Sequence, residues 1–163
     1  MKELTAGLRS GLQAALDDLR ALARGIYPPL LADQGLAAAL RAQATKAPLP
    51  VSIEVDGIGR YPRDAEAAVY FCTLEALQNV AKYAQATQTI VSLSCRGDHL
   101  VFAIADDGAG FDTTTATQGT GLQGMADRLA ALGGALHIHS QPGFGTTVTG
   151  SLPVAEQAGP GCA

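Results

Sequence analysis

Three polar side chains stand at helical spacing in segment 75–84. Glu75, Asn79 and Lys82 occupy positions i, i+4 and i+7, which places them on one face of a helix. A carboxylate can accept a proton, an amide oxygen is a hard ligand for magnesium, and an ammonium can pair with phosphate. The spacing therefore suits a magnesium–phosphate site. The alternative is an ordinary solvated helix face that carries a Glu/Lys pair.

A second cluster follows the continuously apolar segment 100–105. The run that begins at Asp106 reads DDGAGF, so two acids are followed by Gly108 and Gly110. An acid at a strand end can accept a hydrogen bond from an adenine amino group, and glycines let the backbone approach a ligand closely. The alternative is a common glycine-rich acidic turn. A calcium loop is disfavoured because its acid spacing and its distal Glu are missing.

A glycine loop, GTGLQG, occupies positions 119–124. It matches G-x-G-x-x-G, but dinucleotide binding would require a strand directly before it and an acid about 20 residues later. Residues 113–118 read TTTATQ, and Gly143 lies near the expected acid position. The P-loop and the protein-kinase glycine loop are also excluded, since the lysines they require are absent. What the pattern predicts is a flexible loop that enters a helix N-terminus and can hold phosphates.

The histidines at 137 and 139 alternate on a predicted strand, so they share one face. No third ligand stands at an obvious spacing for zinc, and we predict surface or half-buried histidines instead.

Composition limits the class of protein. The chain has 163 residues, 47% of them hydrophobic, which suits one domain with a short appendage. A net charge of −4 argues against nucleic acid as a partner. No uncharged apolar stretch of about 18 residues exists to contact or span a membrane. Three cysteines without CxxC spacing predict reduced thiols and a cytoplasmic location.

The elements that must position these motifs follow from periodicity and breakers. We expect helices at 3–24, 35–46 (capped by Asp33), 63–84 and 124–132. Strands are expected at 51–55, 90–94, 100–105, 135–140 and 145–152. This order predicts an α+β fold: a two-layer α/β sandwich with a mixed sheet covered on one face by helices, preceded by a short helical segment. The expected units are a helical remnant at 1–47, a catalytic domain at 48–154 and a disordered tail at 155–163.

Together, the order and spacing of the motifs resemble the ATPase family shared by histidine kinases, type II topoisomerases, mismatch-repair ATPases and the heat-shock chaperone. Segment 75–82 resembles its N box, segments 106–111 and 119–125 its two glycine boxes, and segment 143–153 its closing segment. The form Leu-x-Gly-Met-x-x-Arg at 122–128 is similar to sensor histidine kinases of the nitrate-sensor type. The junction at 28–40 resembles the region after their dimerisation helices.

The resemblance implies ATP and Mg²⁺ as cofactors and assigns a role to each motif. Glu75 would act as a base or polarise water, Asn79 would bind magnesium, and Asp106 would accept from the adenine amino group. Residues 107–123 would form a lid over the nucleotide. The remaining nucleotide-binding residues implied are Lys82, Gly108, Gly110, Gly119, Thr120, Gly121, Leu122 and Thr146.

The resemblance also implies the reaction and the partners. The γ-phosphoryl group of ATP would pass to a histidine on a dimerisation helix and then to a response regulator. The resemblance places this domain in the cytoplasm, as part of a homodimeric parent protein that is either cytoplasmic or membrane-anchored. The chain departs from the family in two ways: Tyr83 stands where a histidine is frequent, and no histidine followed by an acid is present. We therefore expect a piece of a larger kinase. The alternative is a nucleotide-gated binding module, or a serine kinase, of the anti-sigma regulator type.

Overall fold

The computed structural model describes residues 27–115 and 119–154. The expected helix at 3–24 and the expected tail at 155–163 lie outside these ranges. Within the described residues, no helix is long and apolar enough to cross a membrane.

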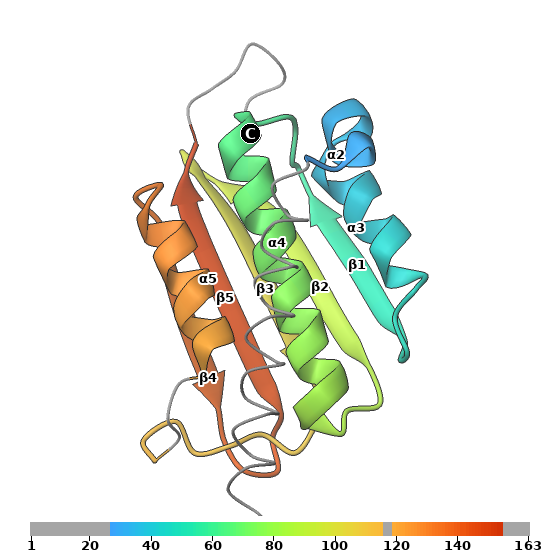
Figure 1. Ribbon diagram of the computed structural model, residues 1–163, viewed down its shortest axis with the longest axis vertical. Helices are drawn as coiled ribbons and strands as arrows, with labels where there is room; N and C mark the ends of the chain where they lie inside the picture. Colours follow the sequence, from blue (N-terminus) through green and yellow to red (C-terminus); the bar gives the residue numbers. More distant parts are fainter. Residues whose placement is uncertain (1–26, 116–118, 155–163) are drawn as a thin grey trace, which may run out of the picture.

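A five-stranded mixed sheet forms one layer of the molecule (Figure 1). The strands are β1 (Val51–Asp56), β2 (Thr89–Arg96), β3 (His99–Asp106), β4 (Ala135–Ser140) and β5 (Thr146–Pro153), in the order β1-β2-β3-β5-β4. β1 pairs with β2 in parallel, and the other pairs are antiparallel. The expected α+β sandwich with a mixed sheet is confirmed.

The second layer consists of helices on one face of the sheet (Figure 1). They are α2 (Pro29–Gln34), α3 (Leu36–Ala44), α4 (Arg63–Asn79), which continues into the π-helical turn η1 (Val80–Ala84), and α5 (Thr120–Ala130). α4 crosses the middle of the sheet and supplies most of the buried helical side chains. A single hydrophobic core lies between the layers; its fully buried large side chains include Leu31, Leu36, Leu40, Val69, Val91, Leu93, Leu100, Phe102, Ile104, Leu129 and Leu152.

Polar contacts of Arg60 tie α2 to the start of α4. Glu66 is 1% exposed and accepts hydrogen bonds from the Arg60 Nε at 3.0 Å and from the Tyr61 amide at 3.1 Å. Arg60 also donates to the carbonyl of Ala32 at 3.0 Å, close to the end of α2. Arg60 itself is half-exposed, with 51% of its side chain accessible, so it bridges the buried Glu66 carboxylate and the end of α2 from the surface.

Two helix starts differ from the prediction. Asp33 does not cap the second helix: it lies inside α2, which begins after Pro28, and the N-cap of α3 is Gly35. Proline fits the first turn of a helix because its missing amide would have no partner there. α5 begins at Thr120, four residues before the predicted start, so the glycine loop contributes its own first helical turn.

The cysteines differ among themselves. Cys72 is buried and free, whereas Cys95 is disulfide-bonded. The prediction of reduced thiols is therefore wrong for Cys95, because a cysteine count does not reveal whether a pair forms.

Candidate functional site: a nucleotide-sized cavity

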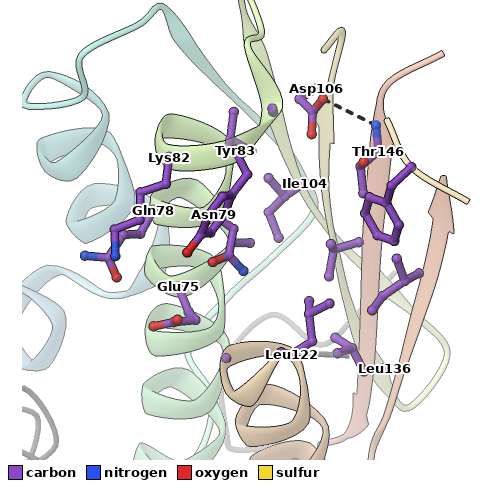
Figure 2. A pocket seen from close by; sticks show the side chains of 18 of the residues that line it. Glu75, Gln78, Asn79, Lys82, Tyr83, Ile104, Asp106, Leu122, Leu136 and Thr146 are labelled. Carbon is purple, nitrogen blue, oxygen red and sulfur yellow. Dashed lines mark hydrogen bonds between the residues drawn. The ribbon is translucent and has the colours of Figure 1, made fainter. Parts of the chain in front are cut away.

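A cavity of about 600 Å³ opens between the end of α4, the start of α5 and the ends of β3, β4 and β5 (Figure 2). Its size is that of a site for a nucleotide or a drug-sized ligand. Ten of the eleven site residues expected from the sequence line it: Glu75, Asn79, Lys82, Asp106, Gly110, Gly119, Thr120, Gly121, Leu122 and Thr146.

The helix face expected at 75–82 forms one wall of this cavity. Figure 2 shows the side chains of Glu75, Asn79 and Lys82 projecting from the same helix. Glu75 and Asn79 are half-buried, whereas Lys82 is exposed. Lys82 stands in the π-helical turn after Asn79, and single π turns inside helices often occur at functional sites. The polar face is thus part of a cavity rather than an ordinary solvated surface.

The opposite wall carries Asp106, the last residue of β3. Its Oδ1 accepts a hydrogen bond from the amide of Gly108 at 2.8 Å. It also accepts one from the amide of Thr146 at 3.3 Å, drawn as a dashed line in Figure 2. A carboxylate has about four acceptor positions. Asp106 is therefore held in place by backbone amides and keeps acceptor capacity for a ligand donor.

Gly108 is the expected site residue that does not line the cavity. Its close approach to η1 leaves no room for a side chain, because a Cβ there would lie 2.2 Å from the carbonyl oxygen of Ala84. The neighbouring amide of Ala109 donates to that same oxygen at 2.7 Å. Gly108 thus shapes the site indirectly, by letting the loop after β3 pack against the end of η1.

Gly110 combines a lining position with a close backbone approach. Its φ is +62°, and a Cβ would lie 2.0 Å from the carbonyl oxygen of Gln141. On the same side, the Ser140 hydroxyl accepts from the Phe111 amide at 2.9 Å and lies 2.8 Å from the Thr146 hydroxyl. These contacts join the first glycine box to the β4–β5 hairpin and fix that end of the cavity.

The N-terminus of α5 faces the same space. Gly119 is its N-cap and supplies no side-chain cap, so the first-turn amides keep their hydrogen-bonding capacity for a ligand. Gly121 lies close to Glu75: a Cβ there would be 2.7 Å from the Glu75 Oε1. An amide-lined helix end, a carboxylate and an amide side chain therefore converge on one volume.

The sequence matches the family of histidine kinase-, DNA gyrase B- and HSP90-like ATPases over residues 64–156, more than half of the chain. The chain belongs to this family. It is 32% identical over 156 residues to the signal transduction histidine-protein kinase/phosphatase DegS of Brevibacillus brevis, covering 92% of this chain and 40% of DegS. It is 33% identical over 148 residues to the oxygen sensor histidine kinase NreB of Staphylococcus carnosus, covering 86% of this chain and 43% of NreB.

Solved structures support the fold. The histidine kinase AdeS of Acinetobacter baumannii superposes with a TM-score of 0.61 at 18% identity, covering 90% of this chain and 80% of that one. The chain spans less than half the length of DegS and NreB. It is thus an ATP-binding domain of the histidine-kinase type, and its relatives favour this class over the anti-sigma regulators.

In this ATPase domain, sequence reasoning missed the apolar part of the cavity. Residues of β3, β4 and β5 line this part, together with residues of the helices and of the loop after β3. The only sequence pattern that could have indicated these strand residues is the alternation of apolar and polar positions. Alternation predicts that a residue faces the core, but it does not predict that a cavity opens there. The additional lining residues include Gln78, Tyr83, Ile104, Phe111, Thr113, Ala126, Leu136, His137, Ile138 and Val148. His137 and His139 are exposed, as predicted, and no cluster of three metal-binding acids, histidines or cysteines occurs in the described parts of the ATPase domain.

Asp107 follows Asp106, the residue expected to bind adenine, but its carboxylate makes only structural contacts among the described residues. Its carboxylate accepts from the hydroxyl and amide of Thr87 and from the amide of Gln88 at 3.1 Å. These hydrogen bonds, that from the Thr87 hydroxyl above all, hold the pKa of the Asp107 carboxyl below its ordinary value. Asp107 thus fastens the turn after η1 to the end of β3 and does not line the cavity.

Proposed function

We propose that this domain transfers the γ-phosphoryl group of ATP to a histidine on a dimerisation helix of the same kinase. The observation that carries the proposal is the convergence of Glu75, Asn79, Asp106 and the α5 N-terminus on one nucleotide-sized cavity. In the reaction, the bond between the γ-phosphorus and its bridging oxygen breaks, a phosphorus–nitrogen bond forms, and ADP leaves. The attacking nitrogen of the histidine ring uses its lone pair, and Glu75 takes the proton from the other ring nitrogen, directly or through water.

The other residues position the nucleotide. Asp106 accepts a hydrogen bond from the adenine amino group. Thr146 lies next to this contact, because its amide donates to the Asp106 carboxylate. Lys82 meets phosphate oxygens. The first-turn amides after Gly119 face the phosphates, where the helix dipole favours negative charge.

The donor set suits magnesium. Mg²⁺ is usually bound by one or two protein oxygens together with substrate phosphates and water, rather than by a cage of side chains. Asn79 offers one amide oxygen on the cavity wall, beside Glu75. When bound, the ion would neutralise charge on the phosphates, and Asn79 is the residue that would hold it.

The remaining parts of the proposal concern the whole protein. The parent is a homodimeric cytoplasmic or membrane-anchored kinase that passes the phosphoryl group to a response regulator. Residues 48–154 form the catalytic domain, and the segment before them continues from the dimerisation region. DegS and NreB, which are named histidine kinases, support this assignment.

Transfer in trans tests the proposal. We expect the chain, mixed with radiolabelled ATP, magnesium and the dimerisation domain of a related kinase, to produce acid-labile phosphohistidine on that domain. The chain alone should remain unlabelled, because His99, His137 and His139 lie on exposed strand positions and none has an acidic residue after it. Label located by mass spectrometry on one of these three, with none on the supplied domain, would contradict the proposal.

The magnesium assignment predicts a selective loss in the Asn79→Ala variant. ATP affinity measured by calorimetry in the presence of Mg²⁺ should fall about tenfold. This loss is near the lower end of the range for removing one polar contact to a charged group. Affinity measured in the presence of a chelator should stay close to that of the wild-type chain. Gln88→Ala provides a matched exposed amide outside the cavity. An equal loss with and without the ion would assign Asn79 to the nucleotide itself.

A further inference from the structure

Thr89, the first residue of β2, holds a hydroxyl group without a hydrogen-bond partner in a fully buried place. The residue is 1% exposed, and its Oγ1 is the one buried side-chain oxygen or nitrogen atom in the described residues that lacks a partner. Its amide is satisfied by the carbonyl of Pro50 at 3.0 Å. A buried hydroxyl without a partner costs free energy that an isosteric valine would not.

The register of the sheet places this hydroxyl beside the adenine candidate. Thr89 is the direct cross-strand partner of Asp106, and Asp106 is the partner of Thr146 on its other side. Directly opposed residues lie on the same face of a sheet, with Cβ atoms about 4.5–5.5 Å apart. A hydroxyl and a carboxylate at that separation can meet directly or through one bound water.

The hydroxyl groups of the next two residues across the sheet, Thr146 and Ser140, already have hydrogen-bond partners. Thr146 and Ser140 lie 2.8 Å apart through their hydroxyl oxygens, and Ser140 also donates to the carbonyl of Gly145 at 3.0 Å. Asp106 uses Oδ1 for two backbone amides. With about four acceptor positions on a carboxylate, a ligand amino group and the Thr89 hydroxyl can both be accommodated.

We propose that Thr89 is a positioning residue for adenine recognition: its hydroxyl donates to the Asp106 carboxylate, directly or through one water, in the nucleotide-bound state. This inference rests on the proposed role of Asp106. The Thr89 hydroxyl orients the Asp106 carboxylate toward the amino group of the base. In the nucleotide-bound state the carboxylate is thus the hydrogen-bond partner that the hydroxyl lacks in the ligand-free structure. Thr89 itself does not line the cavity, so it acts through Asp106.

The Thr89→Val variant tests the inference because its two expected effects have opposite signs. Without nucleotide, the variant should melt at or above the temperature of the wild-type chain, since a hydroxyl without a partner has been replaced by a methyl group of similar size. Its affinity for ATP should fall about three- to tenfold, the range for one hydrogen bond. Thr89→Ser keeps the hydroxyl and should restore ATP affinity even where it lowers the melting temperature.

A purine nucleoside triphosphate that lacks the 6-amino group separates positioning from general damage. Its affinity should differ little between wild type and Thr89→Val, because no amino group contacts Asp106. Unchanged ATP affinity in Thr89→Val, while Asp106→Asn weakens ATP binding, would overturn the Thr89 inference alone. Unchanged ATP affinity in both variants would overturn the adenine role of Asp106 as well. An equal loss for both nucleotides would show that Thr89 is only structural.

Discussion

Replacing Glu75 with glutamine is expected to slow phosphoryl transfer to a supplied dimerisation domain by about 10²–10⁴-fold, the usual loss when a general base is removed. Glutamine keeps the size of the side chain and its place beside Gly121, so the cavity should keep its shape. ATP affinity, measured by calorimetry, should therefore stay close to that of the wild-type chain. The pair of measurements distinguishes chemistry from binding.

Glu54→Gln is the matched control for this experiment. Glu54 is an exposed carboxylate on β1 and does not line the cavity, and the substitution removes the same charge. Transfer by this variant should equal that of the wild type. If Glu75→Gln also transfers at the wild-type rate, Glu75 is not the base, and a nucleotide-gated binding module becomes the better description of the chain.

Asp106→Asn should weaken ATP binding by roughly ten- to a hundredfold. A hydrogen bond to a charged group contributes about 1.5–3 kcal/mol in a buried site. The amide side chain cannot replace the carboxylate: its single oxygen is needed by the backbone amides of Gly108 and Thr146, and its NH₂ group would then face the amino group of the base.

The Asp106 prediction is measured by calorimetric titration of ATP into both proteins. Asp56→Asn, an exposed position at the end of β1 away from the cavity, serves as the control for lost charge. Equal ATP affinities for the wild-type chain and Asp106→Asn would remove Asp106 from adenine recognition, whatever happens at Glu75.

Periodicity and turn residues in the sequence predicted most of the fold. The five strands lie within two residues of their expected bounds, and the long helix spans the predicted 63–84, because strand alternation and helical spacing are local properties. Local rules failed at the helix starts. The predicted cap Asp33 lies inside α2, which begins at Pro29, and the glycine loop enters α5 at Thr120, four residues before the predicted start, because propensity is a weak guide where tertiary context sets a helix end.

The sequence by itself determined which residue types could serve a phosphate ligand: Glu75 and Asn79 share a helix face through their spacing, and Asp106 ends an apolar strand. Only the tertiary structure decided that these motifs meet in one cavity, that Gly108 supports the site from outside, and that Leu136 and Val148 line it. It also placed Thr89 beside Asp106, because strand register is set by pairing between segments far apart in the chain. Local patterns can show which face a side chain takes, but its neighbours across the sheet follow only from the folded register.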